Sequence, residues 1–219
     1  MKVSVVIPTL NEEKNLPKVM KELPKNIDEI IVVDGHSRDR TLEIAKRYGA
    51  KVLFDDIGKG SALRKGMEAA RGDIIITMDA DYSHKSSEIG LLIEGIKSGF
   101  DICMGSRFIQ GGGTEDMPWY RRFANKLFVF LVNLTWGMNY SDICYGYRSF
   151  RKNCVKKLNL KSEGFSIEAE ISIKAAKYGL KVLEVPSLEK RRNFGESKLR
   201  TFRDGFQILK TIIHEMLSD

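Results

Sequence analysis

The sequence predicts an α/β protein, built on a mostly parallel sheet that is flanked by helices, and two observations support this prediction. Apolar runs of strand length alternate with helix-like segments along the first hundred of the 219 residues. Strands that are buried on both faces and connected by helices form parallel sheets. Hydrophobic residues also make up 42% of the chain, which is enough for the core of one domain.

The first half of the chain is regular. Strands are predicted at Val3–Ile7, Ile30–Val33, Val52–Phe54, Ile74–Met78 and Ile102–Met104. The segments between them predict helices at roughly Lys14–Leu23, Thr41–Tyr48, Ser61–Ala70 and Ser86–Lys97. Ligands of such sheets bind at the carboxyl ends of the strands. The polar residues that follow the first, second and fourth strands are therefore expected to share one crevice.

The second half is less regular. Its predicted features are a glycine loop at Gly111–Gly113, an apolar helix at Tyr120–Trp136, a strand at Tyr147–Phe150, a helix at Ile167–Tyr178, a strand at Val182–Val185, a basic segment at Lys190–Arg200 and an amphipathic helix at Phe202–Leu217. No repeat or Pro/Ser-rich linker interrupts the sequence. A single domain over residues 1–219 is therefore expected.

Composition narrows the class of protein. The chain has 36 basic and 29 acidic residues, a formal net charge of +7, which favours anionic partners such as nucleic acid, a membrane surface or phosphorylated ligands. Three cysteines without C-x-x-C spacing indicate reduced thiols in a cytoplasmic setting. The most apolar stretch, Leu127–Met138, is too short for a bilayer, which needs about 20 residues. A soluble or peripheral protein without a signal peptide is expected.

Two carboxylates, Asp79 and Asp81, directly follow the fourth predicted strand. Acids two positions apart at a strand end can converge on one Mg²⁺ or Mn²⁺, which also accepts oxygens from water and from a diphosphate. A solvated turn is the alternative, because Asp is common where strands end. Asp79 and Asp81 are therefore candidate ligands of a divalent metal.

Other strand ends contribute polar groups to the same edge. Pro8–Glu12 follows the first strand, and Asp34 ends the second. Lys59 lies between two glycines where the third helix begins, a place that suits an anion because backbone N–H groups point outward there. An ordinary turn is the alternative for this segment. Neither a P-loop nor a G-x-G-x-x-G motif is present, which counts against a P-loop protein and against a dinucleotide-binding Rossmann domain.

Several segments occur in a recognisable order: Ile7–Glu12, Val33–Thr41, Gly58–Gly60, Asp79–Asp81 and Gly105–Arg107. Together they resemble family 2 glycosyltransferases of GT-A fold. Two later segments, Asp142–Arg148 and Arg192–Lys198, resemble the dolichyl-phosphate mannose synthase branch, and the resemblance extends to about Leu199. It implies a nucleotide-sugar-binding half (1–107), an acceptor-side half (108–200) and a C-terminal amphipathic helix (201–219).

The resemblance also implies roles for individual residues. The donor would be bound by Pro8, Leu10, Glu12, Asp34, Lys59, Asp79, Ala80 and Asp81. Of these, Asp79 and Asp81 would hold the metal and the diphosphate. The catalytic residues would be Asp81 and three cations around the two phosphates, Arg107, Arg192 and Lys198. The acceptor would be bound by Arg107, Arg121, Arg122, Asn125 and Ser197.

The implied enzyme is a metal-dependent, inverting glycosyltransferase. It would move a hexose, with mannose favoured, from a nucleotide-diphosphate sugar to a polyprenyl or dolichyl phosphate. GDP-mannose is the favoured donor, and a UDP-sugar stays open. A lipid phosphate is already ionised, so its attack needs no general base. We expect a peripheral protein at the cytoplasmic membrane face, with a membrane-anchoring partner protein as an open question.

The sequence departs from the family pattern at four points. Gly35 follows Asp34 where a second acid is usual, Ser83 stands where a metal-side Gln is frequent, and Asn125 replaces a Ser four residues after Arg121. The membrane helices that follow the catalytic domain in many members are also missing. The first departure leaves the identity of the nucleobase open.

Three features of the second half have two interpretations each. Arg121 and Arg122 begin an apolar helix, which suits a lipid phosphate or simply a core helix with a basic first turn. The basic segment up to Arg200 binds phosphates or is a solvated face. The last helix carries an apolar stripe of Phe202, Phe206, Leu209, Ile213 and Leu217, which rests on a membrane or caps the sheet, and capping is the expectation.

Other functions are also considered. A hydroxyl acceptor would need a general base, for which Glu168 or Glu170 could serve, while both could instead be surface acids at a helix start. A nucleic-acid-binding module is disfavoured because the basic residues are spread and acids lie at the strand ends. A nucleotide-sugar-binding module without catalysis is the third alternative.

Overall fold

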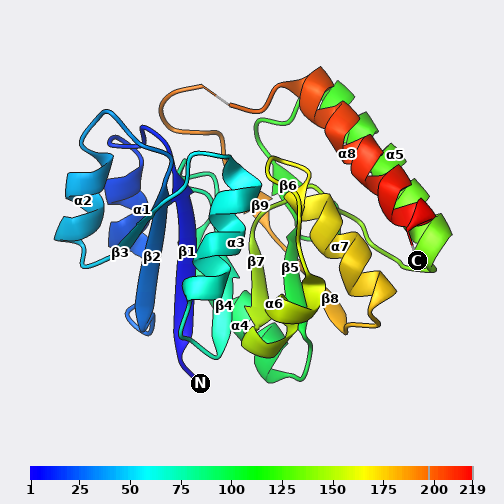
Figure 1. Cartoon of the computed structure of the whole chain (residues 1–219), viewed down its shortest axis with the longest axis horizontal. Helices are drawn as coiled ribbons and strands as arrows, with labels where there is room; N and C mark the ends of the chain where they lie inside the picture. The colour runs from blue at the N-terminus through cyan, green and yellow to red at the C-terminus, as the bar shows by residue number, and fades with distance from the viewer. Residues whose placement is uncertain (197, 219) are drawn as a thin grey trace.

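The computed structural model describes residues 1–196 and 198–218 (Figure 1). Ser197, an expected acceptor-binding residue, therefore lies outside the described residues. The centre of the fold is a seven-stranded sheet with the order β3-β2-β1-β4-β7-β5-β8. Its strands are β1 (Val3–Thr9), β2 (Glu29–Asp34), β3 (Lys51–Phe54), β4 (Ile74–Thr77), β5 (Ile102–Ser106), β7 (Arg148–Arg151) and β8 (Val182–Pro186). Only β7 runs antiparallel to its neighbours in this sheet, so the predicted mostly parallel α/β fold is confirmed.

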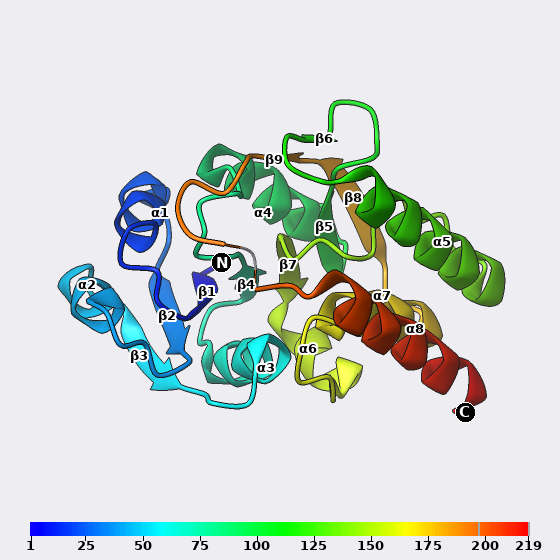
Figure 2. The same cartoon turned by 90° about the horizontal axis from the view of Figure 1, so that it is seen from above.

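Helices cover both faces of the sheet (Figures 1 and 2). They are α1 (Leu16–Glu22), α2 (Thr41–Arg47), α3 (Lys59–Ala69), α4 (Ile89–Lys97), α5 (Trp119–Trp136), α6 (Lys152–Leu158), α7 (Ile167–Lys177) and α8 (Thr201–Leu217), with a 3₁₀ turn at Ser86–Glu88. Side chains alternate along β1, so that Val6 belongs to the apolar cluster that includes residues of α3 and α7, whereas Val5 and Ile7 belong to the cluster that includes residues of α1 and α4. This burial of both faces explains the continuous apolar runs in the sequence.

Three short elements were not predicted. The helix α6 buries only Cys154 and Leu158, too few apolar residues for a clear helical pattern. The strands β6 (Gly113–Thr114) and β9 (Leu188–Glu189) form a two-stranded parallel sheet of their own. Strands of two residues carry no recognisable periodicity, so their pairing depends on the surrounding loops.

The last helix, α8, differs from the expectation. It packs mainly on α5 and α7, and therefore covers the helical layer rather than capping the sheet (Figure 1). Ile208 and Ile212 are its buried apolar residues, and Leu209 of the stripe identified in the sequence packs against the core as well. The other members of that stripe, Phe202, Phe206, Ile213 and Leu217, are exposed, with Phe202 93% exposed. Figure 2 shows α5 and α8 side by side, running away from the sheet in the same direction. None of the described helices combines the length and the hydrophobicity that crossing a bilayer requires.

The packing of α3 on the sheet generates a first prediction. A Cβ atom added to Gly66 would lie 2.3 Å from Val6 Cγ1 and 3.0 Å from Val33 Cγ2. We expect Gly66→Ala to lower the free energy of unfolding by about 1–3 kcal/mol in urea denaturation, because overpacking shifts the helix off the sheet. Gly90→Ala is the control, since an added Cβ in that exposed turn of α4 meets no atom within 4 Å. The control should match the parent or be more stable by up to about 1 kcal/mol. Equal stability of the two variants would contradict the described packing.

Candidate active site

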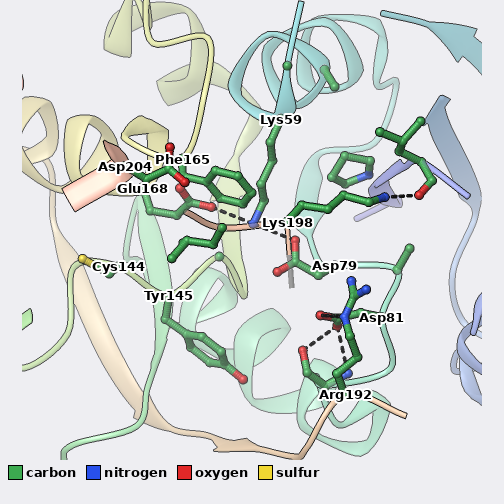
Figure 3. Close-up of a pocket in the computed structure, with 18 of the residues that line it drawn as sticks. Lys59, Asp79, Asp81, Cys144, Tyr145, Phe165, Glu168, Arg192, Lys198 and Asp204 are labelled. Atoms are coloured by element: carbon green, nitrogen blue, oxygen red, sulfur yellow. Dashed lines mark hydrogen bonds and ion pairs between the residues drawn. The ribbon is translucent and has the colours of Figure 1, made fainter. Parts of the chain in front are cut away.

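A cavity of about 540 Å³ opens at the carboxyl edge of the sheet. It lies where the strand order reverses, because β1 has β2 on one side and β4 on the other. Its wall includes most of the residues singled out in the sequence, namely Pro8, Leu10, Glu12, Lys59, Asp79, Ala80, Asp81, Arg107, Arg121, Asn125, Arg192 and Lys198. Figure 3 shows Lys59, Asp79, Asp81, Glu168, Arg192 and Lys198 around this space. The structure thus brings together segments that are distant in the sequence.

Asp79 lies just beyond β4, on the floor of the cavity. Its backbone N–H donates to Nδ1 of His84 at 3.1 Å, so this ring nitrogen is an acceptor. Burial lowers the pKa of His84, and its ring stacks on Tyr147 with the centroids 4.6 Å apart. His84 therefore acts as a neutral support that fixes the position of Asp79.

Lys59 joins Asp79 to Glu168. Its Nζ atom lies 2.8 Å from Asp79 Oδ1 and 2.9 Å from Glu168 Oε1. Burial opposes the charged form of Lys59, but the two carboxylates outweigh it and raise the pKa of the ammonium well above its ordinary value. Burial also opposes ionisation of Asp79, and the nearby Lys59 reverses this and lowers the pKa of that carboxyl. Lys59 and Asp79 are therefore both charged at neutral pH.

Arg192 makes a second cluster of charges on the opposite side of Asp79. Its Nε atom donates to Asp81 Oδ2 at 3.3 Å, and its Nη2 atom donates to Glu12 Oε1 at 3.0 Å. Lys198 donates to the carbonyl of Leu10, and its Nζ atom lies 3.9 Å from Glu12 Oε1. Burial nevertheless raises the pKa of Glu12 despite these cations. The segment around Arg192 thus crosses the cavity instead of forming a solvated basic face.

The start of α3 differs from the expected anion site. The backbone N–H groups of Gly60 and Ser61 donate to the carbonyl of Glu163, at 2.8 and 3.2 Å. A Cβ on Gly58 or Gly60 would lie 2.6 or 2.5 Å from a backbone oxygen of the 162–163 loop. The two glycines therefore allow this loop to approach, and a carbonyl already occupies the helix terminus. The Lys59 side chain faces the cavity, but the α3 terminus does not bind an anion there.

Arg107 also differs from its expected state. Its Nε and Nη2 atoms donate to the two oxygens of Asp142 at 2.6 and 3.0 Å, and its Nη1 atom donates to Glu189 at 3.1 Å. These carboxylates outweigh burial and raise the pKa of the guanidinium. Arg107 reaches the cavity wall, but two acids already neutralise it. Its geometry supports a structural role, holding β5 to the Asp142 loop and to β9.

Three further residues lie away from the expected positions. Asp34 is fully buried and accepts hydrogen bonds from Thr9 Oγ1, Ser37 N and Ser37 Oγ, so it supports a turn beneath the cavity and is absent from the wall. Arg122 turns outward, with its guanidinium 5.9 Å from the ring centroid of Phe108. The alternative prediction of Glu170 as a general base is wrong, because this residue does not line the cavity. Its carboxylate instead pairs with Lys174 Nζ at 2.7 Å and accepts from the N–H groups of Lys161 and Ser162.

The cavity has wall residues that the sequence analysis missed. Asp55, Asp56 and Ile57 line it next to Gly35. They directly follow β3, so the strand-end argument applied to the other strands would have found them. Cys144 and Phe165 also reach the wall, but neither belongs to a strand end or a charged motif. The cysteine is free, and burial raises its pKa to about 12.

One side of the cavity is formed by α5 and α8. Arg121 bridges the two helices, donating from Nε to Thr201 Oγ1 at 3.0 Å and from Nη2 to the carbonyl of Leu199 at 3.3 Å. Asn125 lies one turn further and is only 3% exposed, yet neither polar atom of its amide has a hydrogen-bond partner. Buried polar atoms normally have partners. Asn125 is therefore suited to a polar ligand group beside Arg121.

The residues at β4 fit a divalent metal. Asp79 and Asp81 present carboxylate oxygens to one cavity, and such oxygens are the ligands that Mg²⁺ and Mn²⁺ prefer. Ser83 hydrogen-bonds to Asp81 Oδ1 at 2.6 Å and orients it. Within residues 1–196 and 198–218, no group of three His, Cys, Asp or Glu side chains forms a metal site. A metal here would complete its coordination with water and with the phosphate oxygens of a ligand.

Comparison with known proteins identifies the family. Residues 4–158 match the profile described as glycosyl transferase family 2. The chain is 40% identical over 212 residues to a dolichol-phosphate mannosyltransferase of Pyrococcus furiosus, covering 91% of this chain and 60% of that protein. It is 31% identical over 211 residues to a polyprenol monophosphomannose synthase of Mycolicibacterium smegmatis, covering 89% and 80%. The chain thus spans 60% of the length of the first relative and more of the second.

Solved structures show the fold independently. A glucosyl-3-phosphoglycerate synthase from Mycobacterium tuberculosis, in complex with Mn²⁺, UDP and glucosyl-3-phosphoglycerate, superposes with a TM-score of 0.77 at 21% identity. The superposition covers 100% of this chain and 81% of that one. This likeness supports the GT-A architecture that the order of motifs implies. On the match over residues 4–158 and the identity to its relatives, the chain belongs to glycosyl transferase family 2.

Proposed function

We propose that this protein is a metal-dependent, inverting glycosyltransferase that moves a hexose from a nucleotide-diphosphate sugar to a polyprenyl phosphate. The observation that carries the proposal is one continuous cavity, which joins the carboxylates after β4 to the cations Arg192 and Lys198 and then to the gap between α5 and α8. The names of the relatives, a dolichol-phosphate mannosyltransferase and a polyprenol monophosphomannose synthase, support mannose and a lipid phosphate.

The donor would lie along the carboxyl ends of β1, β3 and β4. Its nucleoside would lie between Leu10 and the Asp55–Ile57 loop, and its diphosphate at Asp79 and Asp81. When bound there, Mg²⁺ or Mn²⁺ neutralises the diphosphate and stabilises the leaving nucleoside diphosphate. The names of the relatives support mannose as the sugar. GDP-mannose is the favoured donor, and UDP-sugars are the alternative to be tested.

The acceptor phosphate would lie between Arg121, Asn125 and the cations of the 190–200 segment. The helices α5 and α8 both begin at this end of the cavity, and helix N-termini favour anions. Two phosphates 4 Å apart repel by about 4 kcal/mol per charge pair at an effective dielectric constant near 20. Arg192 and Lys198 would offset this repulsion. The ionised phosphate oxygen then displaces the nucleoside diphosphate in line, without a general base.

The outer face of α5 and α8 supports a location at a membrane surface. Its exposed apolar residues are Trp119, Tyr120, Phe123, Leu127, Phe130 and Leu134 of α5, and Phe202, Phe206, Ile213, Met216 and Leu217 of α8. The same helices expose Arg122, Lys126, Arg203 and Lys210. Aromatic and apolar residues mixed with cations fit the interface of a bilayer that contains anionic lipids. A lipid acceptor could then enter between the two helices.

A hydroxyl acceptor is the second candidate. It is favoured by one observation, the position of Glu168 on the cavity wall. The Lys59 ammonium at 2.9 Å competes for this carboxylate, which weakens its use as a base. A nucleic-acid partner finds no support, because the cavity rim carries Glu12, Asp56 and Asp81.

The metal assignment can be tested at Asp81. We expect Asp81→Asn to lower transfer from GDP-mannose to a polyprenyl phosphate by about 100-fold or more, because it removes a metal ligand and a charge at the diphosphate. Calorimetric titration with Mn²⁺ in the presence of GDP should show a matching loss of metal affinity. Glu94→Gln, in an exposed ion pair on α4, serves as the control. Unchanged Mn²⁺ affinity in the Asp81 variant would exclude this site.

The roles of Arg192 and Lys198 in transfer can be tested with Arg191 as the control. Arg192→Ala and Lys198→Ala should each slow transfer at least tenfold, about 1.4 kcal/mol, since they stabilise the phosphates in the transition state. Arg191→Ala is the matched control, because that side chain is 75% exposed and pairs only at the surface with Asp116. If all three variants turn over at the rate of the parent, the Lys190–Arg200 segment has only a structural role.

The outer helix face predicts binding to membranes. The parent protein should sediment with liposomes that contain anionic lipid and be released by salt. Phe202→Ser combined with Phe206→Ser should weaken this binding at least tenfold, because two exposed aromatic side chains are lost. Tyr48→Ser with Leu91→Ser, exposed near α2 and α4, is the control. If the parent instead forms dimers that the Phe variants dissociate, and ignores liposomes, the face is an interface between copies.

A further inference from the structure

Lys59 and Glu168 form an ion pair on the cavity wall that can still bind a ligand. Glu168 is only 4% exposed, yet its carboxylate reaches the cavity wall. Its Oε1 atom lies 2.9 Å from Lys59 Nζ, and the oxygens of a carboxylate can each accept more than one hydrogen bond. An ammonium has three N–H donors, and those of Lys59 serve Asp79 and Glu168. The pair can therefore offer carboxylate oxygens as acceptors and the third ammonium N–H as a donor to a ligand in the cavity.

Gly146 gives access to this pair. A Cβ atom at this position would lie 3.1 Å from Glu168 Oε1, 3.3 Å from Lys59 Nζ and 3.8 Å from Asp79 Oδ2. The carbonyl of Gly146 accepts a hydrogen bond from Thr77 Oγ1 at 2.9 Å, which fixes the loop against β4. Any larger residue would cover the charged groups, so the glycine keeps this part of the floor open.

An aromatic ring completes the surroundings. The ring of Phe165 lies 5.5 Å from Lys59 Nζ and lines the same cavity (Figure 3). A charged pair beside an aromatic ring suits a sugar, which has hydroxyls at its edge and apolar C–H groups on its faces. Adjacent hydroxyls can donate to a carboxylate oxygen and accept from an ammonium.

The position of the Lys59–Glu168 pair indicates that it contacts the donor sugar and not the acceptor. Lys59 contacts Asp79 directly, and Asp79 belongs to the proposed diphosphate site. The hexose is attached to the outer phosphate of the donor, so it must lie next to this carboxylate. The acceptor groups Arg121 and Asn125 come from α5, on another wall of the cavity. A role for Glu168 toward the donor thus follows from its link to Asp79.

We infer that Lys59 and Glu168, with Gly146 leaving room, bind hydroxyls of the donor hexose and determine which nucleotide sugar is accepted. This inference rests on the proposed function, because it places the sugar beside the diphosphate. It assigns Glu168 to substrate recognition rather than to proton removal.

A comparison of donors tests the inference. Transfer to a polyprenyl phosphate is measured with GDP-mannose and with analogues that each lack one mannose hydroxyl. For one of these hydroxyls, we expect its removal to lower kcat/KM of the parent enzyme at least tenfold. The same removal should lower kcat/KM of the Glu168→Gln enzyme less than threefold. Such non-additivity locates the contact, because a general structural defect would affect all donors equally. An equal loss in the two enzymes for every analogue would overturn the inference.

Binding measurements keep the test independent of turnover. In calorimetric titrations with Mg²⁺, Gly146→Ala should weaken the binding of GDP-mannose at least fivefold and the binding of GDP less than twofold, because the added methyl group covers only the sugar site. Glu170→Gln, on the same helix but off the cavity, should leave the ratio of the two affinities unchanged. A Gly146→Ala protein that keeps the parent's ratio would contradict the inference. A parent that binds neither GDP-mannose, UDP-glucose, GDP nor UDP would instead refute the proposed function.

Discussion

Charge compensation at the carboxyl edge of the sheet is the constraint on which the site depends. Glu12, Asp79, Asp81 and Glu168 lie around one cavity, and their mutual repulsion is balanced by Lys59 and Arg192. A buried carboxylate without a counter-charge is costly. The two cations each bridge a pair of acids, so the four carboxyl groups can lie close together around the cavity. This arrangement provides both the negative charge for a metal and the positive charge for phosphates.

The same ion pairs also organise the chain over long distances. Arg192 is 111 residues from Asp81 and 180 from Glu12, so its guanidinium ties the segment before α8 to the ends of β4 and β1. Arg107 similarly joins β5 to Asp142 and to Glu189. In this way the cavity is closed by contacts between charged groups, while the apolar core lies on the two faces of the sheet.

Sequence reasoning could predict the parts that depend on local pattern. The five strands of the first half and the convergence of Glu12, Asp79 and Asp81 followed from apolar runs and from the geometry of parallel strand ends. The pairing of Arg107 with Asp142 could not be predicted, because it depends on the antiparallel strand β7, whose place in the sheet has no local signal. The outward face of α8 was misjudged for a related reason. An apolar stripe shows that a helix is amphipathic, but only its neighbours, here α5 and α7, determine which side they bury.

The position of β7 has a consequence for how the chain acquires its fold during synthesis. In the central sheet, β5 pairs with β7 and β8, both of which lie later in the chain. When residue 107 leaves the ribosome, β5 therefore has no strand to pair with, although β1 to β4 are complete. Pairings across such sequence separations are formed slowly. The first 107 residues therefore contain the carboxylates after β4, but β5 gains its partners in the sheet only when residues 148–186 have been added.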